Sequence, residues 1–300
     1  MIDQSKVIQG LMRCLSLSDE ELYELIRFDI DNGVTFFDLA DIYGNGEAEA
    51  KIGRVLAGHP ELRERMFIQT KCSICRSIGG NYYDLSAQHI VEAVDDSLNR
   101  LGLGHIDALL LHRPDIFMDA EEVAKAFKEL KSKGKVTYFG VSNFSKEAIK
   151  YLQSELEDKL EFNQVQLGLG HLDLIDEVFN FNMDNEEGKS KGDQTFLYMK
   201  RKGIRLQAWS PFMYGFFKGS IFDEALCPEL NAKLNELAQK YRTSKCALAS
   251  AFVLKLGDNV SIITGSMNKD HVKECLDGTN LDLSKEDWYA LYRAAGKTLP

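Results

Sequence analysis

The sequence predicts an α/β protein, a single closed (β/α)8 barrel of the TIM type over residues 1–300, with extra helical segments near the C-terminus. Short apolar runs rich in branched residues alternate about eight times with segments of helical period. The apolar runs are nearly continuous, which suits strands that a parallel sheet covers on both faces. Because no Pro-rich or Ser-rich linker interrupts the chain, one domain is expected.

Local signals place the elements in order. Val7 to Met12 is the first predicted strand, and Ser18 with Glu21 makes a capping box for a helix that ends at Asn32-Gly33. Further helices are predicted to about residue 56, then over 86–101, 119–133 and 146–156, and from about 269. The other predicted strands are 34–40, 67–71, 106–112, 136–141, 162–167, 204–208 and 260–264. Segments 213–228 and 284–295 do not fit the repeat and are expected to be additions.

Two other architectures are compatible with parts of the sequence. A length of 300 residues also suits two domains of about 150 residues each, although single barrels of about 250 residues are common. A doubly wound open sheet is the second choice. That fold usually places a G-x-G-x-x-G turn after its first strand, and the sequence contains no such motif.

Composition excludes several classes of protein. With 44% hydrophobic and 27% charged residues, the chain is expected to fold around a sizeable core rather than to be disordered. Its net charge of −10 disfavours nucleic acid as a partner. The longest nearly apolar stretch, 246–254, is much shorter than the roughly 20 residues of a membrane span. Residues 1–13 lack a secretion signal, so the cytosol is the expected location.

The six cysteines are too scattered for a disulfide framework, and most are expected to be small buried hydrophobes. Cys72 and Cys75 form a C-x-x-C pair that follows a predicted strand, whereas a redox pair opens a helix. A structural role is therefore favoured for them. No second C-x-x-C and no H-x-x-x-H accompanies the pair, so no metal site is expected.

Polar residues stand at the C-terminal ends of the predicted strands, where parallel barrels place their active sites. The second, third and fourth strands end near Asp38, Lys71 and His112. The later strands end near Ser142, Asn143, Gln164, Trp209, Ser210, Gly265 and Ser266. A carboxylate, an amine, an imidazole and amides on one rim form a candidate catalytic site.

Tyr43 completes this set, because it follows Asp38 by five residues in the loop beyond the strand. A Lys71 ammonium held by Asp38 is expected to favour the phenolate and so to lower a tyrosine pKa that starts near about 10. Such a tyrosine would donate a proton to a carbonyl oxygen, and His112 would donate a hydrogen bond to the same oxygen. Hydride transfer requires a cofactor.

Seven segments follow one another along the chain as recognisable motifs: FDLADIYG at 37–44, TK at 70–71, LLLHRPD at 109–115, GVSNF at 140–144, NQV at 163–165, AWSP at 208–211 and GS at 265–266. Together they resemble the aldo-keto reductase superfamily over nearly the whole chain, and most closely its bacterial oxidoreductase branch, which is related to potassium-channel β subunits. The resemblance implies an NAD(P)H-dependent enzyme that reduces small carbonyl compounds.

Carried over by position, the resemblance implies a catalytic tetrad of Asp38, Tyr43, Lys71 and His112, with Tyr43 as the general acid. It implies that the nicotinamide carboxamide is bound by Ser142, Asn143 and Gln164, that the nicotinamide ring stacks on Trp209, and that Ser210 approaches the pyrophosphate. The adenosine 2′-phosphate and adenine are expected near Ser266, Asn268 and His271.

The chain departs from the family pattern at the phosphate site. Gly265 and His271 stand where many members carry Lys and Arg, and Lys269 and Lys273 are the nearby residues that could compensate. NADPH is therefore expected, with NADH kept as an alternative. Segment 166–172 also differs from the family, so the resemblance implies no substrate preference.

Several alternatives stay open at this point. Asp38 and Lys71 could be a structural ion pair, and the protein could be a nicotinamide-binding redox-sensing subunit with little turnover. A third reading is a hydrolase or lyase that uses Lys71 as a Schiff-base amine. The aromatic residues Phe212, Tyr214, Phe216 and Phe217 could line a substrate mouth or form a lid. The sequence leaves the oligomeric state open.

Overall fold

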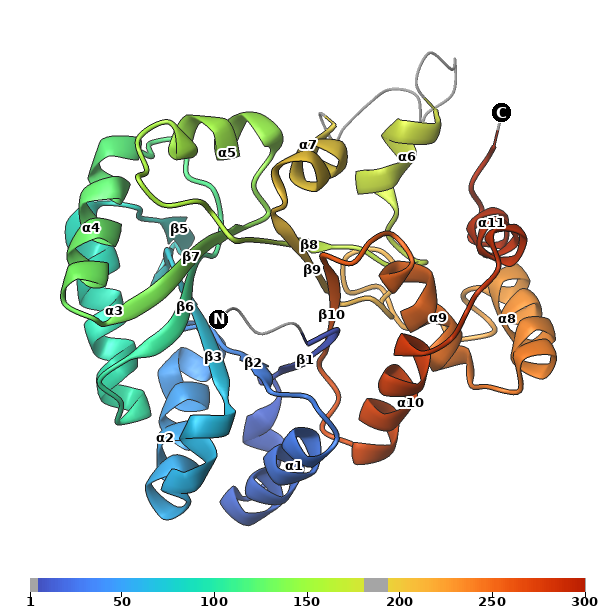
Figure 1. The fold of residues 1–300 in the computed structure, drawn as a ribbon, viewed down its shortest axis with the longest axis horizontal. Helices are drawn as coiled ribbons and strands as arrows, with labels where there is room; N and C mark the ends of the chain where they lie inside the picture. Colours follow the sequence, from blue (N-terminus) through green and yellow to red (C-terminus); the bar gives the residue numbers. More distant parts are fainter. Residues whose placement is uncertain (1–4, 181–193, 300) are drawn as a thin grey trace. The chain divides into compact units, whose positions relative to one another are not determined.

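Eight parallel strands form a closed barrel in the computed structural model, which describes residues 5–180 and 194–299 (Figure 1). Around the barrel the order is β1, β10, β9, β8, β7, β6, β3 and β2. The strands are β1 (Val7–Gly10), β2 (Phe36–Asp38), β3 (Phe67–Cys72), β6 (Ile106–Leu111), β7 (Val136–Ser142), β8 (Phe162–Gln166), β9 (Arg205–Trp209) and β10 (Val260–Thr264). The predicted barrel is thereby confirmed.

The chain divides into two compact units, which are described in turn. The first comprises Met1–Gln164 with Gly265–Lys269, and the second comprises Val165–Thr264 with Asp270–Pro300. The expectation that residues 1–300 form one domain stays a prediction.

In the first unit, helices follow the strands β1, β2, β3, β6 and β7. They are α1 (Asp19–Asp31), α2 (Glu47–Gly58), α3 (Ala87–Leu101), α4 (Ala120–Ser132) and α5 (Lys146–Gln153). The Ser18–Glu21 capping box is present, and the Ser86 and Asp119 side chains cap α3 and α4 as predicted. Asp38 is the last residue of β2 and lies opposite Gly10 of β1 and Gln69 of β3. The register therefore brings polar strand ends together at one rim.

A small antiparallel hairpin follows β3 and was not predicted. It is formed by β4 (Ile74–Ser77) and β5 (Gly80–Tyr83), and most of its residues are exposed. Exposed strands of four residues carry no burial pattern, so the sequence offered little beyond the Gly79-Gly80 turn signal. Gly80 has φ +119°, which favours glycine in this turn.

The second unit holds more helix than the sequence predicted. Its helices include α6 (Asp173–Phe179), α7 (Thr195–Lys202), α8 (Pro228–Tyr241), α9 (Lys245–Leu254), α10 (Lys269–Thr279) and α11 (Lys285–Ala294). Helix α9 is buried around its whole circumference, so it lacks the amphipathic period by which helices are predicted. Segment 213–227, which was expected to be an addition to the repeat, forms turns and bends with an isolated bridge between Met213 and Ser220.

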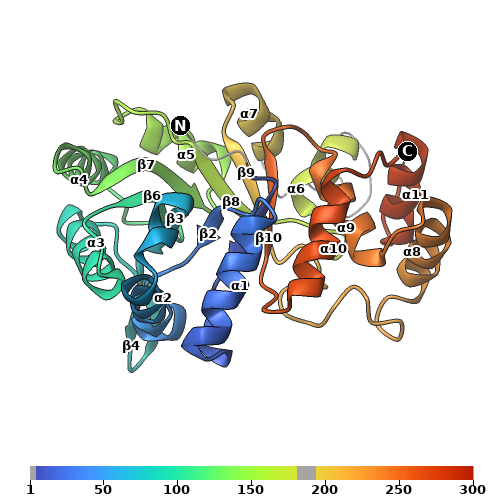
Figure 2. The same cartoon turned by 60° about the horizontal axis from the view of Figure 1, so that its bottom comes forward.

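The extra C-terminal helix is present and packs beside α8 (Figure 2). Trp288 of α11 stacks on Phe252 of α9 with a centroid separation of 4.4 Å, and its indole nitrogen donates to the Phe252 carbonyl. These contacts give α11 a buried face and account for its stability as an addition to the barrel. Within 5–180 and 194–299, no helix combines the length and apolarity of a membrane span.

Candidate active site

Lys71 and Asp38 form a fully buried ion pair at the ends of β3 and β2. Lys71 Nζ lies 2.8 Å from Asp38 Oδ2 and also donates to the Leu39 carbonyl at 2.6 Å. The other carboxylate oxygen, Asp38 Oδ1, accepts from Gln69 Nε2 at 2.6 Å and from Gln164 Nε2 at 2.9 Å. Burial lowers the Lys71 pKa, but the charge of Asp38 and the hydrogen bonds outweigh burial, so the net pKa is raised. The Lys71 amine is therefore protonated, and its hydrogen bonds hold it in place.

Tyr43 is brought back to this cation by the loop that follows β2. Its backbone N–H donates to the Ala40 carbonyl at 3.0 Å, and Gly44 and Asn45 continue the turn with φ values of 59° and 57°. Lys71 Nζ lies 3.2 Å from the Tyr43 hydroxyl. The carboxylate, ammonium and phenol thus form one hydrogen-bonded chain.

The direction of the Tyr43 pKa corrects the sequence-based expectation. Lys71 lowers the pKa, as expected, but desolvation of the hydroxyl is the largest influence and leaves the net pKa raised. The neighbouring carboxylates of Asp38 and Asp41 act in the same direction as desolvation. The phenol consequently keeps its proton at neutral pH, which is the state required of a proton donor.

His112 follows β6 directly, and its backbone N–H donates to the Cys72 carbonyl at 2.8 Å. Its ring faces that of Tyr43 edge-on, with centroids 6.1 Å apart. Desolvation and then the Lys71 and Arg113 charges hold the His112 pKa well below its usual value, so the ring is neutral. Among the described residues, its buried Nδ1 has no hydrogen-bond partner.

Ser142, Asn143 and Gln164 extend the polar network along β7 and β8. Ser142 Oγ donates to the Gln164 carbonyl at 2.9 Å, and Asn143 Nδ2 donates to Ser142 Oγ at 2.9 Å. Asn143 holds a left-handed backbone with φ 61°, a conformation often found at functional sites. Gln164, whose amide donates to Asp38, joins this group to the ion pair.

Gln69 is a site residue that the sequence analysis missed. It precedes Lys71 by two residues on β3, so strand alternation directs both side chains to the same face. Its place two residues before Lys71 in the same predicted strand was the signal that could have identified it.

Ser266 and Asn268 lie in the connection from β10 to α10, within the first unit. The Asn268 N–H donates to Ser266 Oγ at 3.2 Å, and Gln9 Nε2 donates to the Ser266 carbonyl at 3.0 Å. Lys269, one of the two lysines that could compensate for Gly265, lies 3.7 Å from Glu24 Oε2 of α1. Its charge is therefore engaged by an acidic side chain.

Three further predicted residues lie in the second unit. Trp209 ends β9, with the Phe217 ring stacked at 6.5 Å and the Phe216 ring edge-on at 6.3 Å. Ser210 follows with a left-handed φ of 48°, and His271 is exposed on α10. Phe216 and Phe217 thus gather on Trp209, and both stay more than half exposed, at 62% and 51%.

Neither cysteine of the C-x-x-C pair is oxidised. Cys72 is buried, and desolvation holds its pKa well above the usual thiol value, whereas Cys75 is half-buried and lies 3.5 Å from His89 Nε2. Cys72 belongs to β3 and Cys75 to β4. In the described part of the chain, no three His, Cys, Asp or Glu side chains group as metal ligands.

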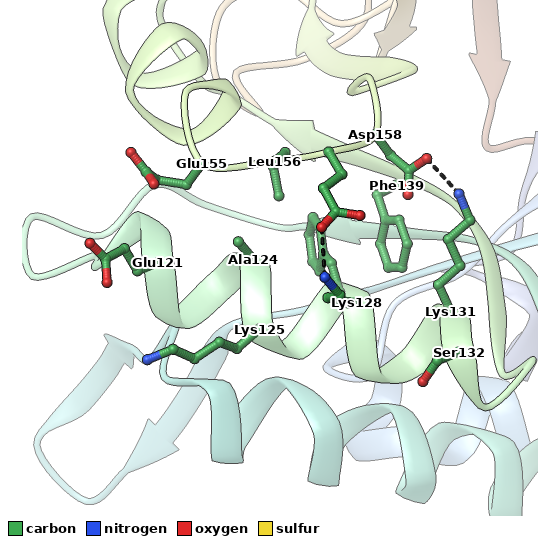
Figure 3. A pocket seen from close by; sticks show the side chains of 12 residues that line it. Glu121, Ala124, Lys125, Lys128, Lys131, Ser132, Phe139, Glu155, Leu156 and Asp158 are labelled. Carbon is green, nitrogen blue, oxygen red and sulfur yellow. Dashed lines mark hydrogen bonds and ion pairs between the residues drawn. The ribbon is translucent and has the colours of Figure 1, made fainter.

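A groove of about 530 Å³ is lined by residues of α4, by Phe139 of β7 and by the loop 155–158 (Figure 3). Its floor includes Phe139, and its edges are joined by ion pairs from Lys128 to Glu157 and from Lys131 to Asp158. Paired charges and an absence of the tetrad residues from its lining distinguish this groove from the candidate active site.

The closed barrel carries a buried Asp38–Lys71 pair and the Tyr43 hydroxyl at its strand ends, which is where barrel enzymes place their active sites. Comparison with known proteins specifies the family. A protein-family model described as "Aldo/keto reductase family" matches residues 6–295 of the sequence. The chain therefore belongs to the aldo/keto reductase family of NAD(P)H-dependent enzymes.

Individual relatives agree with this assignment. The chain is 33% identical to the uncharacterized oxidoreductase YcsN of Bacillus subtilis (strain 168), over 97% of this chain and 94% of that protein. It is 31% identical to a 6-dehydroglucose reductase of Agrobacterium fabrum (strain C58), over 98% and 95%. The solved structure of the thermostable aldo-keto reductase Tm1743 has the same fold, with a TM-score of 0.77 at 23% identity over 97% and 95% of the two chains.

Proposed function

We propose that this enzyme reduces an aldehyde or ketone to the alcohol with NADP(H), and that Tyr43 is the general acid. The observation that carries the proposal is the 3.2 Å contact between the Tyr43 hydroxyl and Lys71 Nζ, with Lys71 itself held 2.8 Å from Asp38. The phenol is therefore placed beside a fixed cation at the strand ends of a barrel, where such enzymes act.

The tetrad residues supply the proton that the reaction consumes. The nicotinamide, when bound, supplies the hydride to the carbonyl carbon. Tyr43 gives its hydroxyl proton to the carbonyl oxygen, and the phenolate that remains is stabilised by the Lys71 ammonium. Asp38 keeps Lys71 charged and oriented throughout, because the carboxylate stays hydrogen-bonded to Gln69 and Gln164.

His112 acts as a hydrogen-bond donor to the same carbonyl oxygen rather than as a second acid. Its lowered pKa keeps the imidazole neutral, so one ring nitrogen carries a hydrogen. A neutral donor polarises the carbonyl without competing with Tyr43 for proton transfer.

The side chains at β7 and β8 fit the carboxamide of a nicotinamide. Ser142, Asn143 and Gln164 present a hydroxyl and two amides, which match a group with one acceptor and two hydrogens to donate. We assign them to the carboxamide, Trp209 to the nicotinamide ring and Ser210 to the pyrophosphate. Ser266, Asn268 and His271 are assigned to the adenosine end of the cofactor. NADPH is preferred over NADH.

The two alternatives differ in measurable ways. A Schiff-base mechanism needs a neutral amine, whereas the net Lys71 pKa is raised and its ammonium donates to three oxygens. A redox-sensing subunit would release product once per bound cofactor, so sustained consumption of NADPH with small aldehydes favours the enzyme. The panel should include 6-dehydroglucose, the compound that the Agrobacterium fabrum relative is named for.

The substitution Tyr43→Phe tests the proposal. It is expected to lower kcat at least about 100-fold, the usual contribution of a general acid, while the dissociation constant for NADPH stays within about twofold. Tyr151→Phe on the exposed face of α5 is the matched control and should leave both values unchanged. Unchanged turnover in Tyr43→Phe contradicts the general-acid role.

A further inference from the structure

The loop after β1 holds Arg13 in a fixed backbone position. The Arg13 carbonyl accepts from the Ser16 N–H at 3.1 Å and from Ser16 Oγ at 2.9 Å. Cys14, the next residue, is fully buried, whereas the Arg13 side chain is exposed. The backbone at Arg13 is thus held in place while its guanidinium is exposed to solvent.

This guanidinium lies against Gly265. Arg13 Nη1 donates to the Gly265 carbonyl at 3.2 Å, and a Cβ built on Gly265 would come within 2.7 Å of the same nitrogen. A side chain at position 265 would therefore require the tip of the Arg13 side chain to shift. The glycine, which looked like the loss of a basic residue at the phosphate site, is what allows a cation from another segment to occupy this place.

Arg13 is also a cation that remains available there. No carboxylate within residues 5–180 and 194–299 forms an ion pair with Arg13, whereas Lys269 lies 3.7 Å from Glu24 and stacks over the Phe28 ring. One N–H of the guanidinium is used by the Gly265 carbonyl, and a guanidinium has five N–H donors. In a chain of net charge −10, an unpaired arginine beside a predicted phosphate site marks where an anion is attracted.

We propose that Arg13 binds the 2′-phosphate of NADP(H), supplying from the β1–α1 loop the charge that position 265 lacks. The inference rests on the proposed function, because it assumes a nicotinamide dinucleotide at the strand ends. It adds a residue that determines cofactor specificity. Arginine suits the role because its planar fork can hold two phosphate oxygens at once.

Isothermal titration calorimetry of NADP⁺ and NAD⁺ with the wild-type protein, Arg13→Gln and Arg13→Lys tests this inference. Arg13→Gln is expected to weaken NADP⁺ binding about tenfold or more, since it removes a charge-assisted contact, and to leave NAD⁺ binding within about twofold. Arg13→Lys should recover part of the loss because it keeps the charge. Raising the salt concentration should weaken NADP⁺ binding less in Arg13→Gln than in the wild type.

Two further variants separate charge from local structure. Gly265→Ala keeps every charge but shifts the guanidinium, so it should reduce the preference for NADP⁺ by less than Arg13→Gln does. Lys269→Gln should leave the preference unchanged. Equal weakening of both dinucleotides in Arg13→Gln, or no weakening, overturns the assignment of Arg13 alone, as does a loss of preference in Lys269→Gln. Failure of the wild-type protein to bind either dinucleotide overturns the proposed function as well.

Discussion

Lys71 Nζ lies 2.8 Å from Asp38 Oδ2, and the exposed fractions of the two side chains are 0% and 3%. A charge pair removed from water to this extent is costly to break, because the partner that remains is a buried and uncompensated ion. The pair therefore couples the stability of the barrel rim to the chemistry proposed for Tyr43.

Asp38→Asn is expected to destabilise the protein by about 3 to 5 kcal/mol, the usual cost of leaving one buried charge unpaired. Urea unfolding followed by circular dichroism measures this free energy. The double variant Asp38→Asn/Lys71→Met should be more stable than Asp38→Asn alone, because no unpaired charge remains. Additive losses in the double variant would show that the two side chains are not coupled.

The pH dependence of reduction follows from the direction of the Tyr43 pKa. Reduction needs the protonated phenol, and a pKa raised above the ordinary value of about 10 keeps it protonated through the neutral range. We expect kcat for reduction to be level from about pH 6 to about pH 9 and to fall only as pH rises through the folded-state pKa. A fall in kcat centred near neutral pH in single-turnover measurements would contradict this expectation.

The sequence predicted the features that are determined by a few neighbouring residues. The Ser18–Glu21 box and the Asp119 cap depend on a few neighbouring positions, and the polar strand ends followed from the strand pattern alone. Asp38, Lys71 and Tyr43 were consequently expected together before their distances were known.

The sequence did not predict contacts between residues that are far apart along the chain. Arg13 meets Gly265 across 252 positions of sequence, and Lys269 pairs with Glu24 of α1 rather than with the loop beside it. The sign of the Tyr43 pKa shift was wrong for a related reason. Burial is a property of the folded environment, and its effect exceeded that of the one charge that the sequence identified.

Asp29 of α1 predicts a pH-dependent stability. Its side chain is fully buried, neither carboxyl oxygen has a hydrogen-bond partner among the described residues, and burial raises its pKa to about 8. The folded state therefore holds a proton that the unfolded chain, with a pKa near about 4, releases. Stability contributed by the protonated carboxyl is lost as pH rises from about 4 to about 8.

Asp29→Asn should remove most of this dependence, because a neutral amide replaces the carboxyl. We expect the variant to be more stable than the wild type by about 1 to 3 kcal/mol at pH 8 and close to it at pH 5. Urea unfolding at the two pH values measures the difference. Asp31→Asn, an exposed neighbour on the same helix, is the control and should show no comparable change between the two values.

Within the second unit, a buried hydrogen bond joins α11 to α6. Tyr292 is fully buried on α11, and its hydroxyl donates at 2.9 Å to Asp176 Oδ1 of α6, a carboxylate that is 3% exposed. Tyr292→Phe keeps the ring packing and removes this donor to a charged group, so it should cost about 1.5 to 3 kcal/mol. Tyr289→Phe on the exposed side of the same helix should cost less than about 0.5 kcal/mol. Equal thermal unfolding midpoints for the two variants would show that the Tyr292 hydroxyl contributes nothing to the stability of α11.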